Sequence, residues 1–99
     1  MKIVWSQLAV DRVGEIAKYI AFDNPNISKR WVNKIFDKVK RLELFPESGK
    51  IVLELNRPEI REIIFGNYRI IYKLEQSQVS ILTVRHGKQI LPIDEIDIE

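Results

Sequence analysis

The residues of this chain whose side chains could do chemistry gather in its second half, on and beside three strand-like runs. The basic members of this group are Arg61, Arg69, Lys73, Arg85, His86 and Lys88. Cleavage of RNA without a metal needs a base for the 2′-hydroxyl, cations for the phosphorane and an acid for the leaving oxygen. The arginines and Lys88 could supply the cations, and His86, Tyr68 or Tyr72 could move protons. The residue types for that reaction are present, so their placement decides whether they can act together.

Arg69 is the most informative of these residues because it lies in the middle of an apolar, strand-like run. Strand alternation divides this run between two faces, with Arg69, Ile71 and Lys73 on one and Tyr68, Ile70 and Tyr72 on the other. A guanidinium in a central strand costs much free energy unless it is paired or reaches water. Two interpretations follow. Arg69 either pairs with Glu62 or Glu75 across the strands, or it belongs to a concave basic site that faces an anion.

The hydrophobic pattern predicts the elements that carry these residues. Residues 2–5 favour an edge strand, and Ser6 can cap a helix whose apolar residues recur at helical spacing as far as Ile20. Asn24 followed by Pro25 can cap a second helix over about residues 25–44. Residues 51–55 are either a short strand or an ordered loop.

Three strand-like runs follow, at residues 60–65, 68–73 and 79–85, and Gly66-Asn67 is a hairpin-type connection between the first two. Runs joined this closely must pair antiparallel, because a parallel crossover needs a dozen or more residues. The order predicts an α+β fold with an N-terminal strand, a helical hairpin and an antiparallel meander. We expect the hairpin to pack on one face of the sheet.

Length and composition limit the kind of protein. The 99 residues suit one domain, which we place at residues 1–93, followed by an acidic tail at 94–99. Cysteine is absent and histidine occurs once, which excludes disulfides and thiolate ligands and argues against zinc. We therefore expect no metal and no cofactor. No apolar run is long enough to cross a bilayer and the start lacks a signal-peptide pattern, so a cytoplasmic location is expected.

Charge is distributed unevenly along the chain. The net charge is +2, but the tail holds four of the fourteen acidic residues, which leaves residues 1–93 at +6. A basic body suggests an anionic partner such as nucleic acid or an acidic protein surface, whereas the simpler interpretation is a solvated tail that aids solubility. A basic ridge on the second predicted helix allows the same two interpretations. Its members are Arg30, Lys34, Lys38 and Arg41.

The pattern in the second half resembles a known family. Arg61-x-Ile-x-x-x-Asn-Tyr-Arg-Ile-Ile-Tyr72, followed after a turn by Ile81-x-x-Val-Arg-His-Gly-Lys88, resembles the C-terminal pattern of toxins of the RelE/ParE superfamily. The turn Pro46-x-x-Gly49 after the second helix also recurs in that superfamily. The match in element order covers nearly the whole chain.

The resemblance implies a toxin of a type II toxin–antitoxin system. In this superfamily a cognate antitoxin wraps the toxin with its C-terminal segment, and the pair often represses its own operon, so operator DNA is contacted through the antitoxin. RelE-like members cut messenger RNA in the ribosome. ParE-like members act on DNA gyrase and are not nucleases.

Two departures from the RelE-like pattern favour the ParE-like branch. RelE-like enzymes tend to carry an arginine just after the Gly-Lys corner and a tyrosine further along. Here Gln89 holds the first position and no tyrosine follows Tyr72. The string Val-Arg-His-Gly-Lys-Gln at 84–89 resembles the His-Gly corner of ParE-like members, which need no catalytic set. The resemblance thus favours a gyrase inhibitor that is not an enzyme.

Two alternatives stay open. The first is a ribosome-dependent ribonuclease that would use Arg61, Arg69, Arg85, His86 and Lys88. The second is a non-toxic module of the same fold that binds DNA or protein.

The resemblance also suggests where partners bind. We expect the antitoxin to bury apolar positions and to place its acidic groups on basic ones, at Leu8, Arg12, Tyr19, Trp31 and Arg69. The target would meet the basic ridge and the sheet corner, at Arg30, Lys34, Lys38, Arg41, His86 and Lys88. A further hypothesis is that the acidic tail folds over the basic sheet when no partner is bound.

Overall fold

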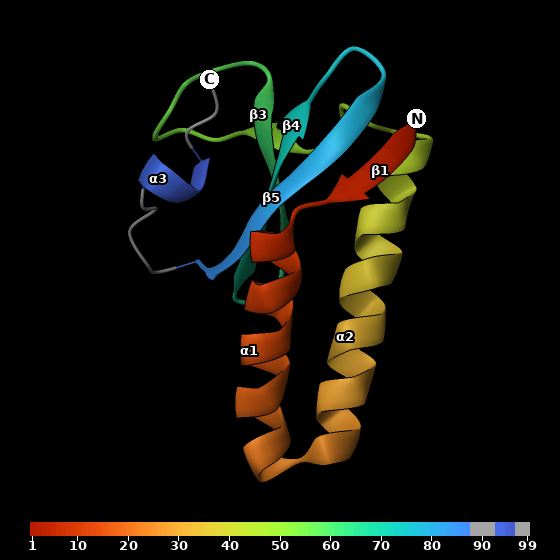
Figure 1. Ribbon diagram of the computed structural model, residues 1–99, viewed down its shortest axis with the longest axis vertical. Helices are drawn as coiled ribbons and strands as arrows, with labels where there is room; N and C mark the ends of the chain where they lie inside the picture. Colours follow the sequence, from red (N-terminus) through yellow and green to blue (C-terminus); the bar gives the residue numbers. More distant parts are fainter. Residues whose placement is uncertain (88–92, 97–99) are drawn as a thin grey trace.

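The computed structural model describes residues 1–87 and 93–96 and shows a sheet with a helical hairpin on one face (Figure 1). The elements are β1 (Lys2–Trp5), α1 (Gln7–Asp23), α2 (Pro25–Lys40), the 3-10 turn η1 (Arg41–Glu43), β2 (Lys50–Ile51), β3 (Ile60–Phe65), β4 (Tyr68–Leu74), β5 (Gln78–His86) and α3 (Ile93–Ile96). The sheet order is β1-β5-β4-β3-β2. The predicted α+β fold, with its strand, helical hairpin and meander, is confirmed.

The meander pairs as the short connections require. β3 pairs antiparallel with β4, and β4 pairs antiparallel with β5. Gly66 adopts a φ of 58° in the β3–β4 turn, a left-handed conformation that glycine reaches without strain. β1 lies parallel to β5, with Trp5 opposite Ile81, because the whole helical hairpin forms the crossover between the two strands.

Both helices begin where the sequence predicts. The Ser6 hydroxyl accepts a hydrogen bond from the Ala9 N–H at 3.0 Å, and the Asn24 side chain accepts from two N–H groups at the start of α2. The predicted end of the second helix is wrong by one turn. The α-helix stops at Lys40, and η1 continues from Arg41 to Glu43.

The segment after the helices is mostly a loop. Only Lys50 and Ile51 pair with β3, so of the two interpretations of residues 51–55 the loop is correct beyond Ile51. The chain then turns, and the N–H groups of Leu55 and Asn56 both donate to the carbonyl of Val52. This loop carries Glu54 over the sheet, where its carboxylate accepts hydrogen bonds from Arg69.

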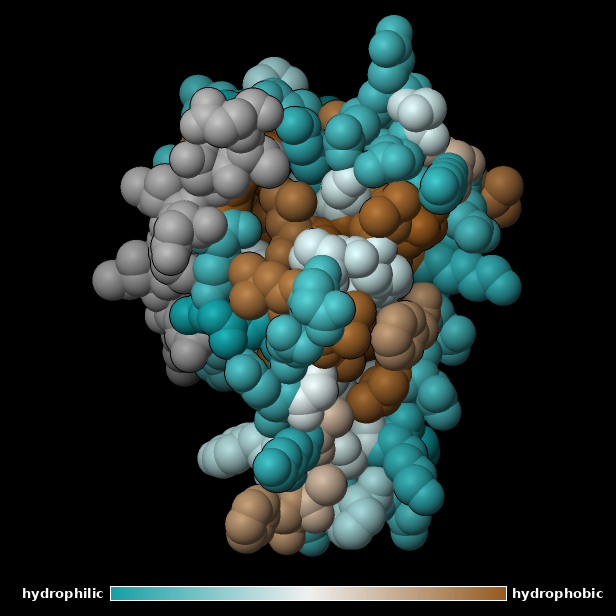
Figure 2. Space-filling model, in the orientation of Figure 1, coloured by the Kyte–Doolittle hydropathy of each residue, from teal (hydrophilic) through white to brown (hydrophobic). Residues whose placement is uncertain are grey.

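The core has a large part under the helices and a small part on the opposite face. Strand alternation sends Ile70 and Tyr72 into the large part, where they pack with residues of α1, α2 and β5. Ile71 points the other way and packs with Val52, Ile60 and Ile96. Figure 2 shows hydrophobic residues gathered between the helices and the sheet, and hydrophilic ones along the outer side of α2. Among the described residues, no helix is long and apolar enough to cross a membrane.

Candidate functional site

Arg69 and Arg85 face each other directly across β4 and β5, on the sheet face that points away from the helical hairpin. Two like charges in direct cross-strand register repel each other, so each arginine needs a compensating carboxylate nearby. The structure provides a separate set of acidic side chains for each.

Arg69 is held by two glutamates. Its Nε donates to Glu62 at 2.5 Å, and its two terminal nitrogens donate to the two oxygens of Glu54 at 2.8 and 3.0 Å. The hydrogen bonds from Arg69 hold the pKa of Glu54 below its usual range. The predicted pair with Glu62 is confirmed, and Glu54 takes the place expected for Glu75. The interpretation of Arg69 as part of a site that faces an external anion is wrong, because its guanidinium is buried between these carboxylates.

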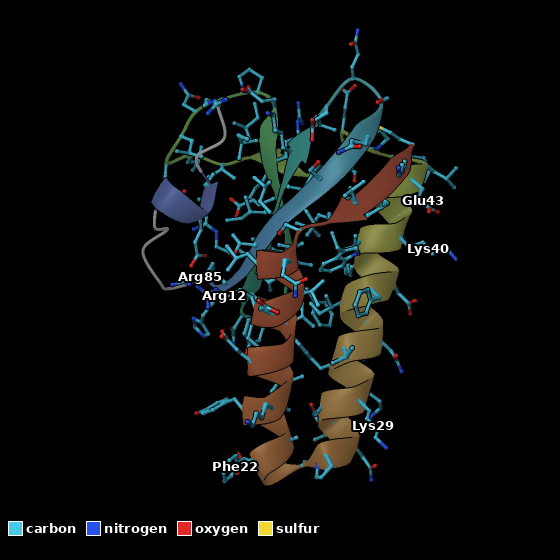
Figure 3. All side chains as sticks on the ribbon, in the orientation of Figure 1. Arg12, Phe22, Lys29, Lys40, Glu43 and Arg85 are labelled. Atoms are coloured by element: carbon cyan, nitrogen blue, oxygen red, sulfur yellow. The ribbon has the colours of Figure 1, made fainter. Side chains whose placement is uncertain are left out.

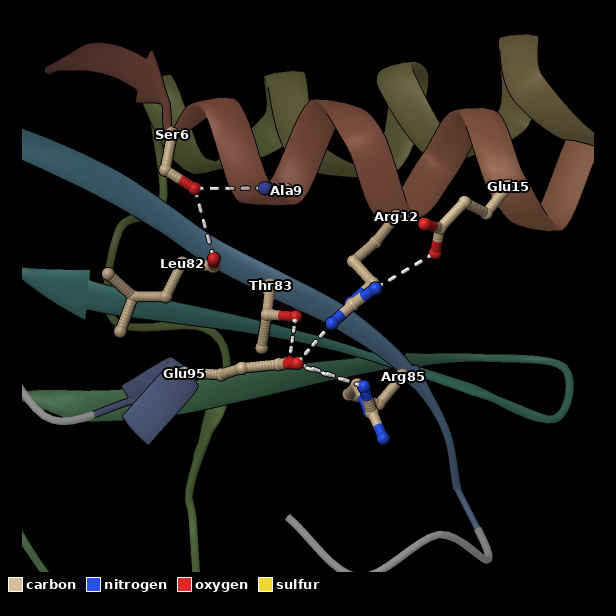
Figure 4. Close-up of polar contacts among 8 residues, drawn as sticks. All are labelled: Ser6, Ala9, Arg12, Glu15, Leu82, Thr83, Arg85 and Glu95. Atoms are coloured by element: carbon tan, nitrogen blue, oxygen red, sulfur yellow. Dashed lines mark hydrogen bonds and ion pairs between the residues drawn. The ribbon is translucent and has the colours of Figure 1, made fainter. Parts of the chain in front are cut away.

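Arg85 is held by an acidic residue of α3. The Glu95 carboxylate accepts hydrogen bonds from Arg85 at 3.1 Å, from the Thr83 hydroxyl at 2.9 Å and from Arg12 of α1 (Figure 4). Burial acts to raise the pKa of Glu95, but the hydrogen bonds from Arg12 and Thr83 outweigh it, so the pKa is lowered. Arg12 also donates to Glu15 at 2.9 Å.

These contacts place one acidic residue of the tail on the basic sheet, as the tail hypothesis expects. Ile96 anchors the same short helix, because its side chain is buried against Val52, Ile60 and Ile71. The rest of the tail after Ile96 lies outside the described residues. The guanidinium groups of Arg12 and Arg85 therefore form one compensated cluster with the carboxylates of Glu15 and Glu95, with an apolar contact beside it.

His86 points to the opposite face from Arg85. It lies opposite Tyr68, and the two rings meet edge to face with centroids 5.6 Å apart. Tyr68 in turn meets Trp31 of α2 at 5.2 Å. Trp31 is only 9% exposed and belongs to the core, so the expectation that a partner buries it is wrong. Its helix position alone does not reveal this, because the sheet residue that covers it is far away in the chain.

Arg61 and Tyr72 lie opposite each other and hold a turn together. The Arg61 guanidinium donates to the backbone carbonyls of Glu47, Gly49 and Pro58. The Tyr72 hydroxyl accepts from the Gly49 N–H and donates to the Pro46 carbonyl, both at 2.9 Å. Tyr72 is fully buried, which raises its pKa, and its hydroxyl is engaged in these two bonds, so it is not open to a substrate. This contact gives the Pro46-x-x-Gly49 motif a structural role.

The residues that we expect to bind an antitoxin lie in different parts of the structure. Arg12 and Tyr19 line a cleft of about 420 Å³ between α1 and the end of β5, whose other residues are Glu15, Ile16, Tyr68, Val84, Arg85 and His86. Tyr19 is 78% exposed, whereas Leu8 is half-buried. Arg69 lies on the other sheet face, beneath Glu54. Only part of the expected surface is therefore brought together.

The residues that we expect to bind a target also lie in two places, on α2 with η1 and at the end of β5. Arg30, Lys34 and Arg41 are exposed on α2 and η1, and Lys38 is half-buried among them. His86 is the last residue of β5 and lies opposite Tyr68, the first residue of β4. Lys88 lies outside the described residues. Within the part of the chain that is described, no group of three or more His, Asp or Glu side chains is placed to hold a metal ion.

Glu54 is the site residue that sequence reasoning missed, and Glu95 was included only as part of the acidic tail. Neither lies in a regular pattern: Glu54 reaches Arg69 from the loop after β2, and Glu95 reaches Arg85 and Arg12 from α3. The sequence does contain one signal, because an arginine buried in a strand requires a carboxylate partner. That signal does not identify which of the fourteen acidic residues supply them.

Comparison with known proteins agrees with this architecture. The family model described as ParE toxin of type II toxin-antitoxin system, parDE, matches residues 3–91. The candidate toxin Y4kP of Sinorhizobium fredii is 34% identical over 97 residues, which cover 92% of this chain and 93% of that protein.

Two solved structures share the fold. A chain of the chromosomal ParDE toxin–antitoxin system from P. aeruginosa superposes with a TM-score of 0.74 at 18% identity, over 89% of this chain and 97% of that one. A chain of the toxin–antitoxin complex RelBE2 from Mycobacterium tuberculosis gives 0.54 at 20% identity, over 86% and 95%. With the family match over residues 3–91, the predicted RelE/ParE resemblance and its ParE-like branch are confirmed: the chain belongs to the family of ParE toxins of type II toxin–antitoxin systems.

Proposed function

We propose that this toxin inhibits DNA gyrase by binding it directly, and that a cognate antitoxin neutralises it. The observation that carries the proposal is the division of the basic residues. Arg61 and His86 lie on the helix side of the sheet, whereas Arg69 and Arg85 lie on the other side. A ribonuclease would need such groups around one phosphate, and a toxin that acts by binding does not.

The engagement of the three arginines supports the same conclusion. Arg69 and Arg85 are neutralised by carboxylates, and Arg61 is bound to backbone carbonyls. To stabilise a phosphorane, each would first have to break these contacts in a partly buried site. Membership of the ParE family agrees with a gyrase target, since the ParE-like branch acts on gyrase.

Supercoiling of relaxed plasmid by purified gyrase tests the proposal. The purified toxin is expected to inhibit supercoiling in a dose-dependent manner, and addition of the antitoxin should restore it. A heat-denatured toxin sample serves as the control. Full supercoiling activity at saturating native toxin would show that gyrase is not the target.

Ribosome-dependent cleavage of messenger RNA is the second candidate, because one cleft does bring together Arg85, His86 and Tyr68. That activity predicts cleaved messenger RNA in a reconstituted translation reaction, and loss of cleavage in His86→Ala. Intact messenger RNA in the presence of a toxin that arrests growth would exclude this candidate.

The antitoxin is proposed to place an acidic side chain at Arg12 and apolar side chains against Leu8 and Tyr19. The support is that Arg12, Thr83 and Arg85 already accommodate the carboxylate of Glu95. Deletion of the C-terminal half of the antitoxin should then abolish binding to the toxin. Unchanged affinity after this deletion would place the interface elsewhere.

Operator DNA is proposed to be contacted only through the antitoxin. The isolated toxin should therefore not bind an operator duplex at physiological salt, whereas the toxin–antitoxin complex should bind it. Binding of the toxin alone, with a steep dependence on salt, would instead indicate a DNA-binding module of the same fold.

A further inference from the structure

A cationic groove lies between the C-terminal half of α2 and the β2–β3 edge of the sheet. One depression of about 480 Å³ is lined by Lys38, Arg41, Phe45, Lys50, Ile63 and Ile64, together with Ser48, Gly49 and Glu62. An adjoining depression of about 520 Å³ shares Lys38 and Arg41 and adds Lys34, Asp37 and Phe65. We call the two together the α2–β3 groove. Its cations include three of the four residues of the basic ridge.

The positive charge of this groove is uncompensated, unlike that of Arg69 and Arg85. Among the residues that the structure describes, Lys34, Lys38, Arg41 and Lys50 form no ion pair, and Asp37 and Glu62 are the acidic side chains that line the groove. The Glu62 carboxylate is already bound to Arg69. Uncompensated charge of one sign attracts a partner of the opposite sign and steers its approach.

The lining of the groove is apolar as well as cationic. Phe45 is 62% exposed and Ile64 is 44% exposed, although both are large hydrophobic residues. β2 pairs only with Arg61 and Glu62, so the last three residues of β3 have no strand neighbour on that side within the described chain. Apolar side chains at an open sheet edge, rimmed by charge, are typical of surfaces that bind another protein.

The chemistry of the lining favours a protein over a nucleic acid. Nucleic-acid grooves follow the phosphate backbone with basic side chains and stack bases on aromatic rings. Here the aliphatic side chains of Ile63 and Ile64 line the groove beside the rings of Phe45 and Phe65, and the carboxylate of Asp37 would repel a phosphate backbone. An acidic side chain next to an apolar one matches both parts of the groove.

We infer that the α2–β3 groove is the surface that docks the target, and that it takes a protein segment carrying acidic side chains beside an apolar one. The inference rests on the proposed function, in which the toxin acts by binding a protein. It goes further by separating the target surface from the cleft at Arg12. The toxin would thus meet its target and its antitoxin with different faces.

The test reverses charge on two faces of α2. Lys38→Glu with Arg41→Glu changes the groove, and Lys29→Glu with Lys40→Glu makes the same change of charge on the outer side of the helix (Figure 3). The readouts are growth arrest on expression, affinity for purified gyrase, and capture by the antitoxin. The groove variant is expected to lose growth arrest and about tenfold or more in gyrase affinity, with capture retained. The control variant should stay within about twofold.

A second pair of variants tests the apolar part without any change of charge. Phe45→Ser lies in the groove, and Phe22→Ser lies at the far end of the helical hairpin, where the ring is 88% exposed (Figure 3). Phe45→Ser is expected to weaken growth arrest and gyrase binding, and Phe22→Ser is expected to leave both unchanged. If a groove variant and its matched control changed growth arrest and gyrase binding equally, for either the charge pair or the phenylalanine pair, the inference would be overturned.

The remaining outcomes separate this inference from the proposed function. If the wild-type toxin arrests growth without binding gyrase, and only the groove variants fail to arrest growth, the gyrase proposal fails and the docking surface stands. A wild-type chain that arrests no growth contradicts both. Duplex DNA binding that is lost in the groove variant would identify a nucleic-acid partner and overturn the inference.

Discussion

Glu62 accepts a hydrogen bond from Arg69 Nε at 2.5 Å across β3 and β4, and both side chains are less than a tenth exposed. The pair neutralises a charge that would otherwise be buried in the centre of a sheet. It also removes Arg69 from any role that needs a guanidinium open to a substrate. A buried pair of this kind is sensitive to the loss of one partner, and replacement of both partners is often tolerated.

Arg69→Met is expected to destabilise the fold by about 3 kcal/mol, because Glu62 would remain buried without its partner. The double variant Glu62→Leu with Arg69→Met should recover most of that loss, since it leaves no buried charge and keeps similar volumes. Urea unfolding of the three proteins measures the effect. A single variant as stable as the wild type would mean that the pair contributes little.

Tyr72→Phe should destabilise the fold by about 1–2 kcal/mol, because the buried N–H of Gly49 and the carbonyl of Pro46 would lose their partner. Tyr19→Phe is the matched control, since Tyr19 is 78% exposed and its loss of a hydroxyl should have no effect. Thermal melts compare the melting temperature of each variant with that of the wild type. Equal melting temperatures would contradict a structural role for the Tyr72 hydroxyl.

Gly49→Ala should destabilise the same turn by a different route. A methyl group at this position would come within 2.8 Å of the Glu62 carbonyl oxygen and would also meet the Tyr72 ring. Gly14→Ala is the control, because open space surrounds that position on α1 and alanine favours a helix. We expect a lower melting temperature for the first variant and an equal or higher one for the second.

Stability should fall as the solution is made acidic. Hydrogen bonds from Arg69 lower the pKa of Glu54, and those from Arg12 and Thr83 outweigh burial to lower the pKa of Glu95. A carboxylate with a lowered folded-state pKa stabilises the fold fully above its unfolded-state pKa, here 4.5. That stabilisation is lost as the pH drops through the folded-state pKa.

The free energy of unfolding, measured between pH 7 and pH 3, tests this assignment. Glu54→Gln with Glu95→Gln should flatten the fall in stability below about pH 4.5. Some dependence should remain, because the pKa values of Glu59 and Glu75 are also lowered. A variant whose profile runs parallel to that of the wild type would show that other groups are responsible.

Affinity for the antitoxin should respond in opposite directions at Arg12 and Glu95. Arg12→Ala should weaken binding, because a partner carboxylate would lose its cation. Glu95→Ala should tighten it several-fold, because the partner would no longer compete with an internal carboxylate. Lys18→Ala, on an exposed position of the same helix, is the control. Tighter binding in both variants or weaker binding in both would contradict the proposed interface.

The sequence by itself determined the order and type of the elements. Ser6, Asn24 and Gly66 mark helix starts and a tight turn through local chemistry, and the period of the apolar residues distinguishes helix from strand. Short connections forced the meander to be antiparallel, and alternation placed Arg69 and Tyr72 on opposite faces. The pairing of Arg69 with Glu62 was one of two interpretations that this alternation allowed.

Only the tertiary structure decided which charges are compensated. Glu54 and Glu95 reach Arg69 and Arg85 from a loop and a terminal helix, and Tyr68 covers Trp31 from a distant strand. Arg69 and Arg85 of the sheet look like the basic residues of α2 in the sequence, yet the two arginines are paired with carboxylates, whereas Lys34 and Lys38 of α2 form no ion pair within the described residues. The reason is physical: local patterns report the conformation of a segment, whereas charge compensation depends on how different segments meet in the folded chain.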